Sequence, residues 1–470
     1  MERYILNNIA IRSWWLAPYT YVEGIGEERR HERRLTREEF ELLKRCDGEA
    51  DIPGSELLDS LLERKLLRKA ADGEKTDPFL LHRSYDNRLV PCMALYVTER
   101  CNFNCLHCYE AVSNERPRRE ISLEDCRRIL SEARECGVQN VTIIGGEPFM
   151  HKGLMDIIRC VYENEMTIDR IYTNGFFITE AFLDELRTID QHILFNVSYD
   201  GAGFHDWMRN FKGAEKDLIK KISIAVNKGY RVRAAMTLNR VNRSAAWETL
   251  LQMEEIGVHE MRVIRTAESP RWLMNAGDAY MSFEEYYDDL TELCRKYAEA
   301  DRKIILNAFH FAKVIPWAKV YEMAPVKCAA SDYKPGMVSC THARESITVL
   351  PDGEVFPCPP SVGEYQAAGL AFGNVLKQGL ESMLQDSPYL SFVCRGVHTI
   401  RENDSKCASC PYFPQCQGGC RLFAERLSGS TFAHDPSKCA FYENRYDLKI
   451  EEALKGYRCL QKVERDEELS

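Results

Sequence analysis

The sequence contains no apolar run approaching the ~20 residues that a membrane-spanning helix needs. Its first fifteen residues lack the basic, apolar and small-residue order of a secretory signal, and we find no internal repeat or low-complexity tract. Excess positive charge is also absent, because the formal net charge is −10. We therefore expect a cytoplasmic protein with no membrane segment and no nucleic-acid partner.

Cysteine, in contrast, is abundant, with 19 in 470 residues. In a reducing cytoplasm this number indicates metal or redox chemistry rather than disulfides. The length exceeds what one compact core usually supports and predicts two or three domains.

Six apolar, strand-like segments alternate with amphipathic helical segments between residue 94 and about residue 300. The predicted strands are 94–98, 141–144, 168–173, 193–198, 231–237 and 261–264, and the clearest predicted helices are 122–136, 154–164, 179–186 and 214–227. This alternation predicts an α/β fold with a parallel sheet, either open or curled toward a barrel. Ligands in such sheets bind at the carboxyl ends of the strands.

The segments on either side differ from this pattern. Residues 1–88 begin with a possible strand or hairpin at 4–15. Thr36 and Glu39 predict a capping box that opens a helix, Gly48 a stop, and Ser55 the start of a second helix before a short strand. We expect a small winged-helix-like module. Residues 328–439 are rich in Pro, Gly and Cys, which is typical of a domain held together by metal, and the last thirty residues are expected to be helical.

Three cysteines follow the first predicted strand at close spacing, Cys101, Cys105 and Cys108. Thiolates are the usual protein ligands of iron–sulfur clusters, and three of them on a four-iron cube leave one iron free for a substrate or cofactor. A structural zinc site is the alternative, with His107 as the fourth ligand.

These residues, with Tyr109 beside the last cysteine, resemble the signature of the radical S-adenosyl-L-methionine (SAM) superfamily. The resemblance implies a partial (β/α)6 barrel in which SAM binds the open iron and is cleaved to a 5′-deoxyadenosyl radical that abstracts hydrogen. It also implies which residues contact SAM. The amino group would meet Gly145, Gly146, Glu147 and Pro148, the ribose Thr173, Asn174, Ser198 and Asp200, and the carboxylate Arg209, and Tyr109 would also contact SAM.

The cysteines of the C-terminal part match the SPASM extension of some radical SAM enzymes, including Gly353 between the first two. In that family seven cysteines bind two auxiliary 4Fe–4S clusters, which gives three 4Fe–4S clusters in all. One auxiliary cluster would be held by Cys407, Cys410, Cys416 and Cys439. The other would be held by Cys340, Cys358 and Cys420, with Cys328 as a candidate fourth ligand, Cys394 as a weaker one, and a substrate atom or an open iron as alternatives. The remaining cysteines are expected to be buried small hydrophobes: 46, 92, 126, 136, 160, 294 and 459.

Enzymes with a SPASM extension mostly modify peptides, and the N-terminal block resembles the PqqD-like element that binds a leader peptide as an added strand. We therefore divide the chain into a leader-recognition module (1–88), a radical SAM partial barrel (89–310), a SPASM domain (311–445) and a helical tail (446–470). The expected partners are a precursor peptide and an external electron donor such as flavodoxin or ferredoxin. The expected reaction is an oxidative crosslink, thioether or carbon–carbon, with epimerisation and decarboxylation left open.

Two other functions compete with this one. Sulfatase-maturing enzymes, which form formylglycine, place Asp directly after the second SPASM cysteine, whereas Pro359 follows Cys358 here. A non-catalytic iron–sulfur or zinc binding protein would form no deoxyadenosine from SAM.

Overall fold

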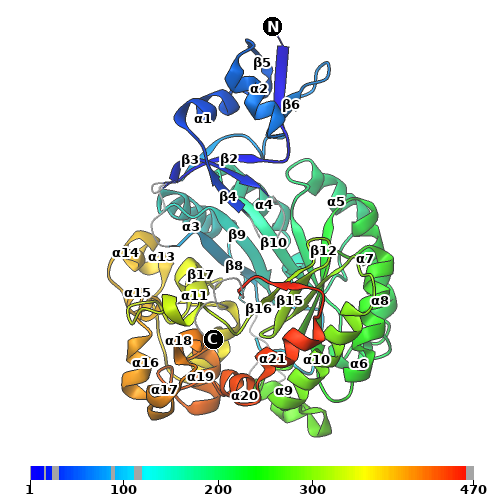
Figure 1. Ribbon diagram of the computed structural model, residues 1–470, viewed down its shortest axis with the longest axis vertical. Coiled ribbons are helices and arrows are strands. Elements are labelled where there is room, and N and C mark those ends of the chain that lie inside the picture. The colour runs from blue at the N-terminus through cyan, green and yellow to red at the C-terminus, as the bar shows by residue number, and fades with distance from the viewer. Residues whose placement is uncertain (1, 15–16, 24–30, 86–89, 111–118, 462–470) are drawn as a thin grey trace.

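The computed structural model describes residues 2–14, 17–23, 31–85, 90–110 and 119–461. A 12-stranded sheet forms its centre, with the strand order β18-β17-β8-β9-β10-β11-β12-β13-β14-β15-β16-β19 (Figure 1). All six predicted strands are confirmed, as β8 (Cys92–Thr98), β9 (Asn140–Gly145), β10 (Thr167–Thr173), β11 (Leu194–Ser198), β12 (Arg231–Leu238) and β13 (Glu260–Arg265). They run parallel to one another and to β14 (Ile305–Ala308).

Helices connect these strands and cover the outer face of the sheet. They are α3 (Leu123–Glu135), α4 (Leu154–Glu163), α5 (Glu180–Arg187), α6 (His205–Arg209), α7 (Ala214–Asn227), α8 (Ala246–Ile256), α9 (Pro270–Asn275) and α10 (Phe283–Ala298). The Ser122 and Thr179 side chains accept hydrogen bonds from the first turns of α3 and α5, which fixes where these helices begin. Every second strand residue, such as Ile143, Ile171 and Val263, is fully buried against the helices. The predicted α/β fold with a parallel sheet is thus confirmed.

The N-terminal residues form two small sheets with two helices. In one sheet β1 (Glu2–Leu6) lies between β5 (Asp47–Ile52) and β6 (Leu67–Lys69). The other has the order β4-β3-β2-β7, formed by His31–Arg34, Ala17–Glu23, Ala10–Trp14 and Arg83–Tyr85. Residues 4–15 are therefore not a hairpin, because β1 and β2 belong to different sheets.

The two predicted helices of this module are present as α1 (Arg37–Lys44) and α2 (Glu56–Glu63), and both halves of the Thr36–Glu39 capping box form. The predicted stop at Gly48 is wrong, since α1 ends at Lys44 and Gly48 lies in β5. Gly48 has φ +88°, and a Cβ there would clash with the Glu74 carbonyl oxygen. This position therefore needs glycine for its left-handed backbone and for the close approach of the loop at residues 74–75, not for a helix end.

The module contacts the large sheet at the amino-terminal ends of β10 and β11. Arg83 Nη1 donates to the carbonyl of Met166, 3.1 Å away and just before β10. His192, just before β11, lies 3.4 Å from the Asp77 carboxylate and stacks near Phe79 at 5.3 Å between ring centres. In Figure 1 the module accordingly lies at the top, at the opposite end from α6 and α9.

The C-terminal part continues the same sheet. Strands β15 (Ala312–Ile315) and β16 (Val320–Met323) extend one end, and β17 (Ser346–Val349) and β18 (Val355–Phe356) extend the other. Between and after them lie short helices: α11 (Thr341–Glu345), α12 (Val362–Ala367), α13 (Val375–Gln378), α14 (Leu380–Gln385), α15 (Pro388–Val393), α16 (His398–Asn403), α17 (Ser405–Ser409), α18 (Phe413–Cys416), α19 (Arg421–Ser428), α20 (Pro436–Glu443) and α21 (Tyr446–Ala453).

The predicted boundary at 310/311 crosses this sheet, because β14 and β15 pair as antiparallel neighbours. Within the described part of the predicted helical tail, residues 446–461, the helix α21 ends at Ala453, and the chain then forms β19 (Arg458–Cys459), which pairs with β16. Within the described residues, no helix is both long and apolar enough to cross a bilayer.

Candidate functional site

The loop that carries Cys101, Cys105 and Cys108 follows β8 and packs against an aromatic cluster. Its Phe103 is 3% exposed and packs with Phe176 and Phe211, at 5.9 and 4.7 Å between ring centres. The three cysteines lie against this aromatic cluster. All three therefore lie at the carboxyl edge of the parallel strands, as the sequence predicts.

Gly145 and Gly146 bring the end of β9 against the start of this loop. Gly146 N donates to the Thr98 carbonyl and Glu147 N to the Arg100 carbonyl, each at 2.8 Å. A Cβ on Gly145 would clash with the Thr98 carbonyl oxygen, and one on Gly146 with that of Arg100. Glycine is thus required here for close backbone approach.

Glu147 is fully buried and connects β9 to β10. Its carboxylate accepts hydrogen bonds from the Thr173 hydroxyl at 2.8 Å, the Asn174 backbone N–H at 2.7 Å and the Phe149 N–H at 3.2 Å. Burial raises the pKa of Glu147 to about 7, although these hydrogen bonds oppose the rise. The Asn174 amide in turn lies 4.0 Å from the Cys101 sulfur, so this network ends at the cysteine loop.

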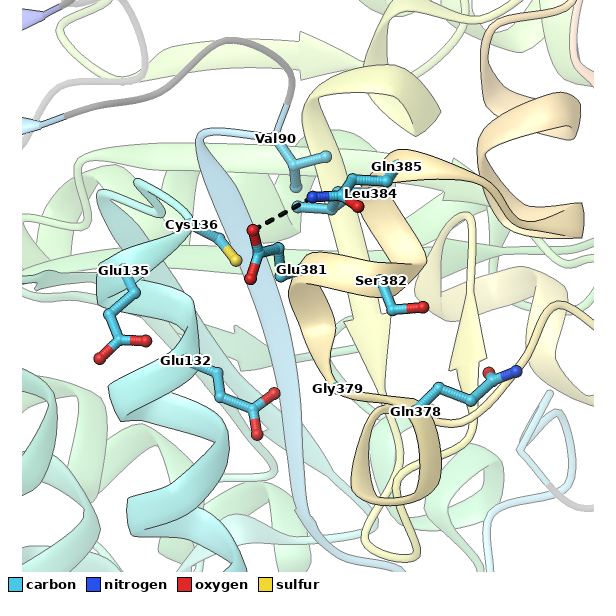
Figure 2. Close-up of a pocket in the computed structure, with 10 residues that line it drawn as sticks. All are labelled: Val90, Glu132, Glu135, Cys136, Gln378, Gly379, Glu381, Ser382, Leu384 and Gln385. Carbon is cyan, nitrogen blue, oxygen red and sulfur yellow. Dashed lines mark hydrogen bonds between the residues drawn. The ribbon is translucent and has the colours of Figure 1, made fainter.

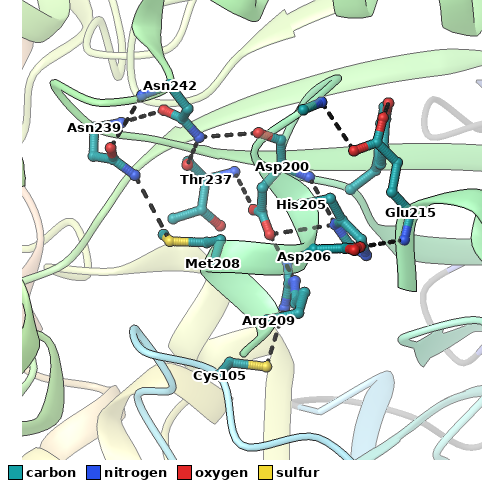
Figure 3. A network of polar contacts seen from close by, with 12 residues as sticks. Cys105, Asp200, His205, Asp206, Met208, Arg209, Glu215, Thr237, Asn239 and Asn242 are labelled. Atoms are coloured by element: carbon teal, nitrogen blue, oxygen red, sulfur yellow. Dashed lines mark hydrogen bonds and ion pairs between the residues drawn. The ribbon is translucent and has the colours of Figure 1, made fainter. Parts of the chain in front are cut away.

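A second buried network joins the end of β11 to the same loop (Figure 3). Asp200 and Arg209 form an ion pair with 2.6 Å between Oδ2 and Nε, and Arg209 Nη1 donates to the Cys105 sulfur at 3.8 Å. Burial opposes ionisation of Asp200, but the Arg209 charge outweighs it and lowers the pKa of this carboxyl. Asp200 Oδ1 also accepts from Thr237 N at 3.1 Å. Arg209 therefore places a fixed positive charge beside a predicted cluster ligand.

Sequence reasoning missed His205, whose Nδ1 lies 3.6 Å from the Asp200 carboxylate. The available signal was its position four residues before Arg209, which places both side chains on one face of α6. His107, the alternative zinc ligand, is influenced electrostatically by Asp200, Arg209 and His205, and burial lowers its pKa to about 3. Among the described residues no three His, Cys, Asp or Glu side chains converge as ligands of a single metal ion would.

The other residues predicted to contact SAM also lie near this edge. Pro148 begins a short 3-10 turn that Glu147 caps, and Ser198 ends β11 with a partly accessible side chain. Tyr109 follows Cys108, and burial raises the pKa of its phenol well above the usual value. Their contacts with SAM remain predictions.

In the C-terminal part, four cysteines line one cavity together with Lys438 and Tyr442: Cys407, Cys410, Cys416 and Cys439. They come from α17, α18 and α20 and from the turn after α17, so the fold gathers residues up to 32 positions apart. Burial raises the pKa of Cys407 and Cys416 to about 12, and the neighbouring thiols add to the effect. A bound metal would reverse this by stabilising the thiolates.

Cys340, Cys358 and Cys420 are also close enough to influence one another. Burial raises the pKa of Cys358 to about 12, with further contributions from Cys420 and Cys340. Cys328 instead donates to the Pro414 carbonyl at 3.5 Å and accepts from Gln417 at 3.1 Å. Cys394 is exposed. The fourth ligand of this set therefore stays open.

Of the seven cysteines expected to be buried small hydrophobes, five are buried: Cys46, Cys126, Cys160, Cys294 and Cys459. Cys92 and Cys136 are partly accessible. Cys136 lines a surface pocket between α3 and α14, which Figure 2 shows with Glu132, Glu135 and Glu381 around it. Val90, just before β8, also lines this pocket, which places it at the amino-terminal end of the strands. The pocket is therefore remote from the predicted cysteine sites.

Comparison with known proteins agrees with this arrangement. The family model for the radical SAM superfamily matches residues 95–253, and that for the SPASM iron–sulfur cluster-binding domain matches residues 340–411. The chain is 25% identical to the antilisterial bacteriocin subtilosin biosynthesis protein AlbA of Bacillus subtilis, over 79% of this chain and 73% of AlbA. It is 23% identical to the AdoMet-dependent heme synthase of Methanosarcina barkeri, over 73% and 95%.

Among solved structures, Streptococcus suis SuiB bound to the precursor peptide SuiA has a similar fold, with a TM-score of 0.61. The match covers 93% of this chain and all of SuiB, at 15% identity. The likeness therefore extends beyond the matched domains to nearly the whole chain.

Proposed function

We propose that this chain, a radical SAM enzyme with a SPASM domain, oxidatively modifies a ribosomally synthesised precursor peptide. The observation that carries the proposal is the presence of two separate cysteine sites: three thiols at the carboxyl edge of the parallel strands, and a cavity among short helices lined by four. A peptide-modifying role is supported by AlbA, named for bacteriocin biosynthesis, and by the fold shared with SuiB.

The side chains at the carboxyl edge fit SAM and an iron–sulfur cluster. Cys101, Cys105 and Cys108 would hold the cluster, and the close backbone approach at Gly145 and Gly146 fixes the end of β9 beside that loop. When bound, SAM supplies the 5′-deoxyadenosyl radical that abstracts hydrogen from the substrate. The chain itself would contribute the segment 145–148 toward an ammonium group, with the buried Glu147 carboxylate tying that segment to β10. The aromatic cluster of Phe103, Phe176 and Phe211 would exclude water.

The two C-terminal cysteine sets would bring the total to three 4Fe–4S clusters. Cys407, Cys410, Cys416 and Cys439 supply four thiols, a complete ligand set for a cube. Cys340, Cys358 and Cys420 supply three, so Cys328 after a small movement, or an atom of the peptide, would complete the set. We assign these clusters the role of accepting an electron from the substrate, and an external flavodoxin or ferredoxin the role of donor.

The N-terminal module would bind the leader of the precursor. Its sheets have edge strands, β4 and β7 in one and β5 and β6 in the other, and an edge strand can accept an added strand. The module contacts the amino-terminal ends of β10 and β11, whereas the cysteine loop lies at the carboxyl ends. Between these two ends lies the length of β10, seven residues or about 23 Å. A precursor whose leader binds the module would have to extend over this distance before its core peptide reached the cysteine loop.

The test is anaerobic co-expression with the small open reading frame beside the gene, followed by mass spectrometry of the peptide. A crosslink removes two hydrogens, and the Cys101→Ala variant should leave the peptide unmodified. Reconstituted enzyme with dithionite and SAM should release 5′-deoxyadenosine. Absence of this product would favour a non-catalytic cluster-binding protein, and formylglycine in the product would favour the sulfatase-maturing alternative. The cytoplasmic location remains a prediction.

A further inference from the structure

The strands of the sheet have an outer wall covered by helices and an inner wall that faces the SPASM segment. In β13, Met261 and Val263 are fully buried toward the helices, whereas Arg262 and Ile264 point to the inner wall and are partly accessible. The same alternation places Arg170 of β10 on the inner wall. The accessible inner side chains indicate a surface that a substrate can reach.

Near the amino-terminal ends of the strands, the charged residues of the inner wall pair with one another. Glu260 lies 2.9 Å from Arg233 Nε, accepts from Asn307 at 2.7 Å and lies 3.8 Å from Lys313 Nζ. All four polar groups come from neighbouring strands β12 to β15. The polar groups of this cluster therefore find their partners within the protein.

Arg262 lies two residues further along β13, toward the carboxyl edge, and, among the residues that the structure describes, has no such partner. Its guanidinium lies over the Phe309 ring at 4.1 Å, and its Nε atom is buried without a hydrogen-bond partner. Within the described part of the chain, no carboxylate lies within salt-bridge distance of it. An arginine keeps its charge, so this partly accessible guanidinium can pair with a carboxylate that a ligand supplies.

Other cations surround the same space. Burial lowers the pKa of His342, and the charges of Arg170, Arg262 and Lys327 lower it further, while that of Asp169 opposes them. Arg170 has a partner, with 3.0 Å between its Nε and the Asp169 carboxylate. In a chain whose net charge is −10, this inner wall is therefore locally positive.

We propose that Arg262, supported by Arg170, binds a carboxylate of the peptide substrate on the inner wall of the sheet. This inference rests on the proposed function and names the class of substrate, a peptide whose modified region is acidic. The carboxylate is either an Asp or Glu side chain near the modified residues or the C-terminal carboxylate of the core peptide. A guanidinium suits both through paired N–H donors.

The experiment uses reconstituted holoenzyme and the precursor peptide identified by co-expression. Arg262→Gln removes the charge, Arg262→Lys keeps it, and Arg127→Gln is the matched control on the exposed face of α3. Each is assayed for KM and kcat on the peptide and for SAM affinity. The peptide is then varied by neutralising each Asp and Glu in turn and, separately, by amidating its C-terminus.

Arg262→Gln is expected to raise the KM of the peptide about 10- to 100-fold, with SAM affinity unchanged and partial recovery in Arg262→Lys. One peptide change, side-chain or terminal, should produce the same rise with wild-type enzyme and no further rise with Arg262→Gln. An unchanged KM overturns the inference, as does a loss confined to SAM affinity or to the spectrum of the auxiliary clusters. If the wild-type enzyme modifies no peptide, the proposed function itself fails, which is a separate outcome.

Discussion

Replacing the buried ion pair of Asp200 and Arg209 tests whether this pair holds the end of β11 to the cysteine loop. Asp200 is fully buried and Arg209 is 7% exposed, so replacing either removes the main countercharge of the other. In Asp200→Asn the amide can still accept from Thr237 N, but its NH2 group faces the Arg209 Nε across a gap of 2.6 Å. Breaking a buried pair in this way costs about 3–5 kcal/mol.

We expect Asp200→Asn and Arg209→Met each to lower the thermal midpoint of the anaerobically reconstituted protein by roughly 3–5 °C. The double variant should lose less than the sum of the two, with a coupling of about 2 kcal/mol or more. Because the pKa of Asp200 is held low, the effect should be the same at pH 5 and pH 8. Additive losses, or single losses below about 1 kcal/mol, would show that the pair is solvated and refute the reasoning.

Three further outcomes follow from the same geometry. Gly146→Ala should abolish iron binding at the first cysteine loop, measured as iron per chain, whereas Gly54→Ala, with open space around its Cα, should not. Glu147 has its pKa raised from 4.5 to about 7, so SAM-free protein should lose about 3 kcal/mol of stability between pH 4.5 and 7, and Glu147→Gln should flatten that slope in pH-dependent melting. Burial opposes protonation of His192, but the contact with Asp77 outweighs it and raises the pKa of His192. The contact therefore stabilises docking of the module below pH 6.5, and this stabilisation is lost as the pH rises through the raised pKa. Asp77→Asn should speed hydrogen exchange in β7 at pH 6 but not at pH 9.

The predicted strands and the cysteine loop could be read from the sequence because their signals are local. Apolar runs between amphipathic helices fix the six parallel strands, and the spacing of Cys101, Cys105 and Cys108 fixes a shared loop. The capping box at Thr36 is equally local. Gly48 shows the limit, because glycine ends helices and also permits close crossings, and only the contact with Glu74 tells the two apart.

The remaining features depend on tertiary contacts that no local pattern encodes. Asp200 and Arg209 were both assigned to SAM, and nothing in their spacing indicates that they pair with each other. Strands β15, β16 and β17 have four residues each, too short for a period-2 pattern to be distinguished from a loop. The division at residue 310 followed composition, whereas the sheet continues across it.

That continuity decides how the cysteine sites are held relative to one another. β17 pairs in parallel with β8, from Ser346 beside Cys92 to Val349 beside Leu95. β8 leads directly into the Cys101 loop, while β17 begins six residues after Cys340 and runs on through β18 to Cys358. The first cysteine loop and part of the C-terminal set therefore extend from two hydrogen-bonded strands. Backbone hydrogen bonds, not a linker between domains, fix their separation, so the space into which a peptide must fit is set when the sheet forms.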